Sequence, residues 1–391
     1  MIELLVVIAG LASIFVGFNI GGSSTGIAWG PPVGAGIVSK SLAAILMTFF
    51  VFLGGWTVGR NVMDTLSNQM INIDISLTAG TAVLFFIGAG ILTANIFSVP
   101  VPTSMTTVGS IVGLGLATES VNTGVILEIV TWWIVTPVIG LWIGGLIGRY
   151  IYPEINARVR IQKSDGPLLE LENSGLIPKP TLGPNTTQTE LISTLFVILV
   201  GCYMSFSAGA SNIPNAAAPL VGGAGINPSV AIIMATLAIG VGAFTIARRT
   251  MKSVGGELSD IPLLAALFVM VTASSITTVL SILGIPISLV MATVMTIVGI
   301  GWGRATRPVQ VSEFVRQDTK GKQISLGAIT AESEEGRKAN PIGRDEHGDA
   351  LEAGDLFNPY AIIKYVSMWI IGPSISTLLS YGFFSVYNGL I

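Results

Sequence analysis

Long apolar runs recur along the chain, separated by short polar or glycine-containing stretches. Several reach the roughly 18 residues that a helix needs to cross the hydrocarbon core of a bilayer. Two shorter apolar segments, at 102–118 and 286–303, complete the pattern. The longer runs lie at 2–16, 42–58, 77–97, 125–147, 191–206, 229–247, 261–283 and 360–386. This pattern predicts an all-α integral membrane protein with about five hydrophobic segments in each half.

The composition agrees with a chain that lies in lipid. Hydrophobic residues make up 51% of the 391 residues and charged residues only 10%, whereas soluble domains carry about a quarter charged residues. Cys202, the only cysteine, lies within a predicted span, and His347, the only histidine, lies in a polar stretch. A zinc site of histidine and cysteine, and an intramembrane protease that pairs serine with histidine, are therefore excluded. The hydropathy indicates a membrane protein rather than an enzyme. The net charge of −3 is too small to indicate a nucleic-acid partner.

Two polar stretches divide the chain. Residues 149–189 are polar and rich in proline, and residues 304–357 hold eight basic and ten acidic residues. Segments of this composition stay in water because they cannot bury enough apolar surface. The expected organisation is a first transmembrane repeat at 1–148, a linker at 149–189, the first part of a second repeat at 190–303, a charged loop at 304–357 and a last segment at 358–391.

The two halves share three motifs in the same order. A glycine- and asparagine-containing motif comes first, a proline-containing motif follows, and a tryptophan four residues before a proline comes last. An internal duplication accounts for this order. The pairs are 17–26 with 209–219, 100–105 with 286–291, and Trp133 and Pro137 with Trp369 and Pro373.

The basic residues indicate how the segments cross the membrane. If each half contributes five segments, 18 of the 19 lysine and arginine residues fall on one face, and only Arg60 falls on the other. The positive-inside rule requires such a split and assigns the basic face to the cytoplasm. An odd number of segments also gives the halves opposite orientations. We therefore predict two inverted repeats in the cell membrane, with the amino terminus outside and both polar stretches in the cytoplasm.

Hydroxyl and amide side chains accompany the repeated motifs, which predict broken or re-entrant helices. Backbone broken in lipid is tolerated only beside protein or a watery cavity, and the amino ends of half-helices favour anions. Such interruptions at matching positions of two repeats point to the central site of a transporter. The metal-binding residues stay unassigned, and a sodium site near Asn19 and Asn212 is one alternative. The candidate anion- or ion-binding residues are Asn19, Ser23, Ser24, Thr25, Thr103, Ser104, Ser207, Ser211, Asn212, Asn215 and Ser288.

The motifs resemble those of the inorganic phosphate transporter (PiT) family across both halves. The family signature Gly-Ala-Asn-Asp-x-Ala-Asn-Ala, followed by Gly-Pro, is similar to the stretch 209–219, and its Pro-x-Ser-Thr-Thr-His motif is similar to 100–105 and 286–291. The resemblance implies cation-coupled uptake of inorganic phosphate, driven by sodium or protons, in a protein that is usually a homodimer. Some members are similar carriers for sulfate. The positions that match the signature are Gly209, Ala210, Asn215, Ala216 and Pro219.

The chain departs from the family pattern at its charged positions. The signature aspartate is Ile20 in one half and Asn212 in the other, and the motif histidine is Met105 or Met291. Monohydrogen phosphate carries a proton that seeks an acceptor, whereas sulfate carries none. A site of neutral groups has no carboxylate to accept that proton and so to prefer phosphate over sulfate. The substrate therefore stays open between phosphate and sulfate or another oxyanion. A passive anion channel and a non-transporting homologue are further alternatives.

Glu128 is the one acidic residue that lies clearly within a predicted span. Charge at membrane depth is rare and often couples transport to protons. Two interpretations stay open for this residue. It is either a proton relay or an interfacial side chain that faces a cavity or a neighbour.

Overall fold

The structure is a computed structural model that describes residues 2–96, 102–158, 169–172, 179–183, 186–245, 262–306 and 359–387. Within these ranges, six helices are long and apolar enough to cross a membrane. A pair of helices bent by 62°, Lys40–Trp56 with Gly59–Gln69, makes a seventh candidate span, and three shorter apolar helices accompany them. The chain is thus a multi-pass, helical membrane protein, as the hydrophobic pattern predicts.

The described elements follow the expected five segments in each half. The first half comprises α1 (Ile2–Gly34), α2 (Lys40–Trp56), α3 (Gly59–Asp64), the π-helical turn η1 (Thr65–Gln69), α4 (Leu77–Ile96), α5 (Thr103–Ala117), α6 (Thr123–Leu146), the π-helical turn η2 (Ile147–Ile151) and α7 (Tyr152–Arg158). The second part comprises β1 (Leu169–Glu172), β2 (Lys179–Leu182), α8 (Gln188–Ala224), α9 (Pro228–Thr245), α11 (Leu263–Ile282), α12 (Leu289–Ala305) and α15 (Pro359–Val386).

The glycine- and asparagine-containing motifs do not break their helices, which corrects the sequence prediction. α1 continues through 17–26 and α8 continues through 209–219. The glycines instead allow close helix packing: a Cβ at Gly21 would collide with the carbonyl of Ile239, and one at Gly209 with the carbonyl of Val51. Small residues at helix contacts favour such packing in membranes. The glycines therefore serve close contact between intact helices rather than a break in the backbone.

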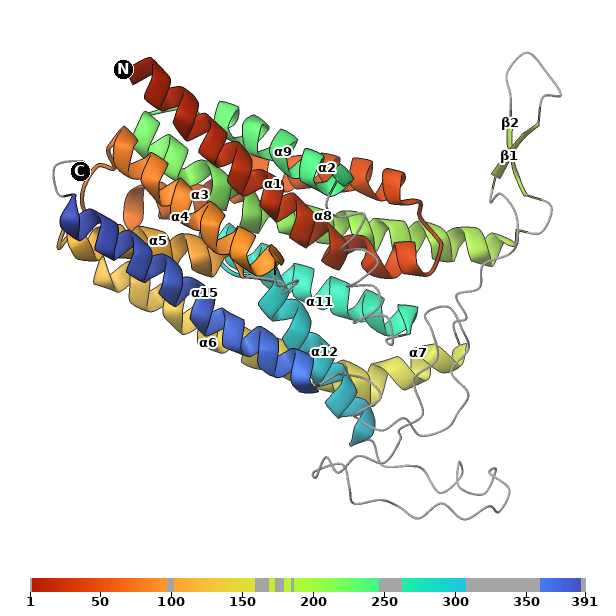
Figure 1. The fold of residues 1–391 in the computed structure, drawn as a ribbon. Coiled ribbons are helices and arrows are strands. Elements are labelled where there is room, and N and C mark those ends of the chain that lie inside the picture. The colour runs from red at the N-terminus through yellow and green to blue at the C-terminus, as the bar shows by residue number, and fades with distance from the viewer. Residues whose placement is uncertain are drawn as a thin grey trace.

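The breaks lie at the proline-containing motifs. α4 and α5 run in opposite directions, as do α11 and α12, so each pair is arranged as a helical hairpin (Figure 1). The first hairpin opens toward the end that carries the termini, and the second opens toward the opposite end. Ser104 Oγ donates to the carbonyl of Ile287 at 2.9 Å, which joins the start of α5 to the turn before α12. Both residues are fully buried, so the hairpins meet inside the bundle.

The two halves pack against each other crosswise. α1 lies against α9 and α8 against α2, while α5 lies against α15 and α12 against α6. Each contact of one half therefore has a counterpart in the other. α1 and α8 also run in opposite directions (Figure 1). An inverted duplication would produce this arrangement, and the duplication itself stays a prediction.

Hydroxyl groups and glycines hold the crosswise pairs together. Ser110 and Ser376 are hydrogen-bonded to each other between α5 and α15, and Ser380 Oγ donates to the carbonyl of Ser110 at 2.7 Å. In the other pair, a Cβ at Gly144 of α6 would collide with the carbonyl of Thr296 of α12. Interhelical hydrogen bonds and small residues are the usual means of packing helices in lipid.

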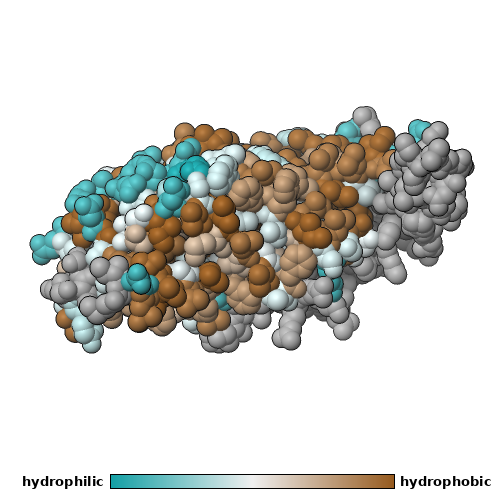
Figure 2. Space-filling view, turned by 90° about the horizontal axis from the view of Figure 1, so that it is seen from above, coloured by the Kyte–Doolittle hydropathy of each residue, from teal (hydrophilic) through white to brown (hydrophobic). Residues whose placement is uncertain are grey.

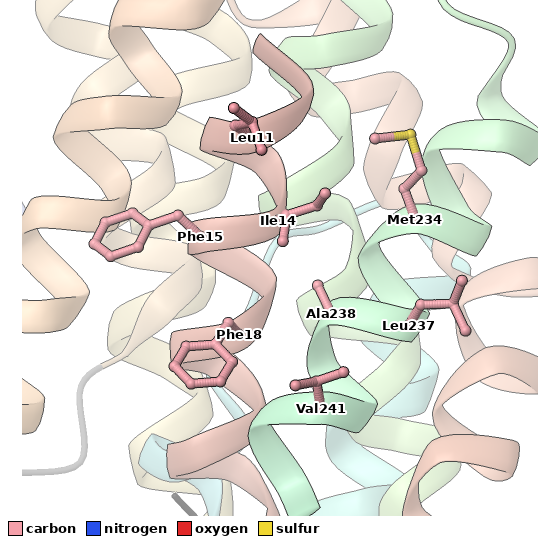
Figure 3. A pocket seen from close by; sticks show the side chains of 8 residues that line it. All are labelled: Leu11, Ile14, Phe15, Phe18, Met234, Leu237, Ala238 and Val241. Atoms are coloured by element: carbon pink, nitrogen blue, oxygen red, sulfur yellow. The ribbon is translucent and has the colours of Figure 1, made fainter. Parts of the chain in front are cut away.

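The outer surface of the bundle is apolar. Figure 2 shows hydrophobic residues over the middle of one face and hydrophilic residues gathered toward the left end. An apolar groove of about 390 Å³ lies between α1 and α9 (Figure 3). Its lining offers an oxyanion no polar side chain, so the groove belongs to the lipid-facing surface. The lining residues are Leu11, Ile14, Phe15, Phe18, Met234, Leu237, Ala238 and Val241.

Helix continues past residue 148 into the first part of the predicted linker. Arg149 lies in η2, and helix continues as α7 to Arg158. Tyr152 is buried against Phe268, with ring centroids 6.5 Å apart, which anchors α7 to α11. β1 and β2 then pair as a small antiparallel hairpin. Most of the predicted charged loop, from residue 307 to 358, lies outside the described residues.

Candidate functional site

Five predicted site residues form one hydrogen-bonded network between α1, α5 and α8. Thr103 Oγ1 donates to Asn212 Oδ1 at 2.6 Å, and Asn212 Nδ2 donates to Ser24 Oγ at 3.2 Å. Asn215 Nδ2 lies 3.2 Å from both Thr103 Oγ1 and Ser104 Oγ and donates to them. None of the five side chains is more than 6% exposed. This central network is built entirely from neutral hydroxyl and amide groups.

The network determines how the amide of Asn215 is oriented. The Thr103 hydroxyl donates to Asn212, and the Ser104 hydroxyl donates to the carbonyl of Ile287. Both oxygens can therefore only accept from Asn215, which must present its NH₂ group to them. Asn215 Oδ1 is buried, and no donor among the described residues reaches it. It is thus an available acceptor for a hydroxyl group or a cation.

The amino ends of α5 and α12 converge beside this network. α5 begins after Pro102, which provides no side-chain cap for its first N–H groups. At the start of α12, Ser288 Oγ accepts from the backbone N–H of Met291 at 3.4 Å. The bond between Ser104 and Ile287 holds the two helix ends together. Helix amino ends carry partial positive charge and free donors, so this region favours an anion.

Six predicted site residues form hydrogen bonds outside the five-residue network. The Asn19 amide donates to the carbonyl of Phe15 at 2.8 Å, for example, and the Ser207 hydroxyl donates to the carbonyl of Ser274 at 3.1 Å. The six are Asn19, Ser23, Thr25, Ser207, Ser211 and Ser288.

The sodium site near Asn19 and Asn212 stays a prediction. Asn212 Oδ1 accepts from Thr103 in this structure, so a cation there would have to displace that hydrogen bond. The part of the chain that the structure describes holds no group of three or more histidine, cysteine or acidic side chains placed to bind a metal. A cation site in this region would therefore use neutral oxygens.

Sequence reasoning missed a row of hydroxyl groups on α11. Ser274, Thr277 and Ser281 are fully buried, and their hydroxyl groups have no partner among the described residues. Their spacing of three and then four residues, which places them on one helix face, is a signal that the sequence contains. Sequence reasoning also missed the hydrogen bond from Trp133 Nε1 to the carbonyl of Pro286 at 2.9 Å, which connects α6 to the second hairpin.

Glu128 lies apart from the central network. It is six residues into α6 and is exposed on the surface of the bundle. A relay would need its carboxylate beside the buried polar groups. The geometry therefore favours the interfacial interpretation of this residue.

Known proteins are similar to this chain over most of its length. The phosphate transporter family matches residues 20–380. The sulfate permease CysP of Bacillus subtilis is 24% identical over 75% of this chain and 76% of its own length. The chloroplastic inorganic phosphate transporter 2-1 of Arabidopsis thaliana is 24% identical over 78% of this chain and 67% of its own.

A solved structure has the same fold. It is described as the sodium-dependent phosphate transporter, with a TM-score of 0.68 and 19% identity. The match covers 99% of this chain and 100% of that one. The likeness therefore extends over both halves of the bundle.

Proposed function

The chain belongs to the phosphate transporter family, and from that premise we propose that it imports inorganic phosphate across the cell membrane by alternating access. The substrate would bind at the central network, between the amino ends of α5 and α12. One bundle would move against the other around this site, as in other carriers with broken helices and paired repeats. The protein acts as a carrier rather than as an enzyme.

The buried acceptor on Asn215 is the observation that carries this proposal. Monohydrogen phosphate has one P–OH group and needs an acceptor for it, while its other oxygens need donors. Asn215 Oδ1 offers that acceptor, and the helix ends and hydroxyl groups beside it offer the donors. A buried polar group without a partner is unfavourable, so a ligand that supplies a donor to Asn215 gains affinity there. Sulfate has no such proton to donate.

The chemistry of the central network also limits how a coupling ion could bind. A sodium ion would be held by neutral amide, hydroxyl and carbonyl oxygens, in keeping with the sodium dependence named for the neighbouring structure. Protons are the alternative driving ion. The predicted orientation places the amino terminus outside and the long polar stretches inside. A homodimer is the expected assembly.

Sulfate is the second candidate substrate. No carboxylate belongs to the central network, so nothing there repels a fully ionised oxyanion. The similarity to a sulfate permease supports the same alternative. If sulfate is the substrate, Asn215 Oδ1 would be occupied by the coupling cation instead.

Uptake into proteoliposomes tests these proposals. Labelled phosphate and labelled sulfate would each be supplied with and without an inward sodium or proton gradient. Concentrative phosphate uptake that sulfate does not inhibit would support the proposal. Preferred sulfate uptake would overturn the substrate assignment, and equilibration that ignores every gradient would indicate a passive channel.

A further inference from the structure

One face of α11 changes character halfway along the helix. Its positions are spaced alternately by four and three residues, which keeps them in line on a helix. The first three side chains are apolar and the last three are hydroxyl groups, and all six are at most 5% exposed. In order, the six are Leu263, Leu267, Met270, Ser274, Thr277 and Ser281.

The three hydroxyl groups differ from most others in the bundle. Hydroxyl groups of transmembrane helices commonly bond to the carbonyl one turn earlier. Ser275 does so with Val271 at 2.8 Å. Ser274, Thr277 and Ser281 form no such bond within the described structure, although they are buried. Buried polar groups without partners are rare and call for an explanation.

The helix α11 that carries these hydroxyl groups packs beside α8, which carries Asn215 of the central network. Ser207 Oγ donates to the carbonyl of Ser274 at 3.1 Å, and α8 and α11 run in the same direction (Figure 1). Ser211 and Asn215 follow Ser207 at intervals of four residues on α8. We define the polar seam as Ser207, Ser211 and Asn215 of α8 with Ser274, Thr277 and Ser281 of α11. Asn215 belongs both to this seam and to the central network.

Of the six matching positions in the first half, three carry a polar side chain, Asn19, Ser23 and Asn95, and the other three do not. Phe15 lies 192 residues before Ser207, and Gly88 and Ile91 lie 186 residues before Ser274 and Thr277. A Cβ at Gly88 would come within 2.5 Å of the Phe15 ring, so the ring occupies this position, and Ile91 is fully buried. Figure 3 shows Phe15 extending from α1 away from Met234 and Leu237. The two halves thus differ at matching places.

We propose that the polar seam between α8 and α11 is the passage by which water and the transported oxyanion move between the central network and the end of the molecule that carries α7. When the seam opens, water satisfies the three hydroxyl groups that lack partners in the closed form. Leu267 and Met270 continue the same face and close the passage toward that end. The α1–α4 seam stays dry at Phe15 and Ile91, because these two side chains offer water nothing to bind. The passage presupposes the proposed transport function, although the hydration of the seam does not.

Single-cysteine labelling tests this inference. Replacing Cys202 by alanine leaves a chain without other cysteines, into which Thr277→Cys, Ile91→Cys and Val279→Cys would be introduced separately. Ile91 is the matched position of the dry seam, and Val279, 57% exposed, faces lipid. Each protein, in proteoliposomes, would be treated with a membrane-impermeant cationic methanethiosulfonate. Because thiols react as thiolates in water, we expect Thr277→Cys to react at least about tenfold faster than both controls.

The outcomes separate the seam from the transported substrate. Equal, slow labelling of Thr277→Cys and Ile91→Cys would overturn the inference, and Ser274→Cys and Ser281→Cys repeat the test should Thr277→Cys fail to fold. Labelling needs no transport, so it is informative even if phosphate uptake fails. Saturating phosphate should slow the labelling of Thr277→Cys. An unchanged rate in phosphate and in sulfate would contradict the assignment of the seam as the oxyanion passage.

Discussion

Replacing Thr103 by valine should destabilise the protein far more than the same change one helical turn away. Valine keeps the volume and shape of threonine but removes the hydroxyl group. Thr103 Oγ1 donates to Asn212 Oδ1 at 2.6 Å and accepts from Asn215 Nδ2 at 3.2 Å. Its loss leaves Asn212 Oδ1 without this donor and removes one of the two hydrogen bonds of Asn215 Nδ2.

The magnitude follows from the cost of those two groups. An unsatisfied buried polar group costs about 1–3 kcal/mol and a lost hydrogen bond about 1 kcal/mol, so Thr103→Val should cost about 2–4 kcal/mol of unfolding free energy. Thr107→Val is the matched control. Thr107 is also buried, but within the described residues its hydroxyl group donates only to the carbonyl of Thr103 in its own helix, at 3.1 Å. Removing such a bond should cost about 1 kcal/mol or less.

Thermal unfolding of the purified protein in detergent measures the difference. At about 2 °C for each kcal/mol in a chain of this size, Thr103→Val should lower Tm by about 4–8 °C. Thr107→Val should lower it by about 2 °C or less. Equal shifts for the two variants would show that the central network does not form, and the proposed site would lose its basis. Because Thr103 would contact the substrate, its variant should also show a raised KM for phosphate uptake.

Three further predictions address substrate choice, coupling and packing. Asn215→Ala should lower the ratio of phosphate to sulfate uptake by about tenfold, since about 1.4 kcal/mol from one lost hydrogen bond corresponds to that factor; an unchanged ratio in competition assays would remove Asn215 from substrate selection. Glu128→Gln should leave the pH dependence of uptake unchanged, because the residue is exposed on α6; a shifted pH profile would restore the proton-relay hypothesis. Gly209→Ala should abolish the folded peak in size-exclusion chromatography, because the new Cβ would collide with the carbonyl of Val51, whereas Gly382→Ala, with nothing within 4 Å, should elute as the native protein does. Normal elution of both variants would contradict the close approach of α2 and α8.

Some site residues could be found from the sequence because their chemistry is unusual in lipid. Asn212 and Asn215 stand out at membrane depth, since an amide there must find partners. Thr103 and Ser104 belong to a proline-containing motif, which marks a break between helices. Ser274, Thr277 and Ser281 could not be ranked in the same way. A hydroxyl group can bond to its own helix, and only the packed structure shows that these three do not.

The positions of the breaks could not be assigned from composition alone. Glycine and asparagine within 17–26 and 209–219 are compatible with a broken helix. They are equally compatible with a continuous helix whose glycines admit the carbonyls of Ile239 and Val51. Sequence reasoning cannot separate the two, because it does not see the neighbouring helix. For the proline-containing motifs the prediction was better, since proline removes a backbone donor and disfavours helix before it.

The sequence by itself determined that this protein lies in a membrane and which apolar segments, polar stretches and motifs it contains. Ten apolar segments, two polar stretches and repeated motifs establish a multi-pass helical membrane protein, because transfer of apolar and charged groups into lipid depends on composition alone. Only the tertiary structure decided which polar groups meet. It joined Ser24 of α1, Thr103 of α5 and Asn212 of α8 into one network, and it left Asn215 Oδ1 without a donor among the described residues. The physical reason is that a hydrogen bond depends on distance and direction between helices that are remote in sequence, and helix packing alone sets both.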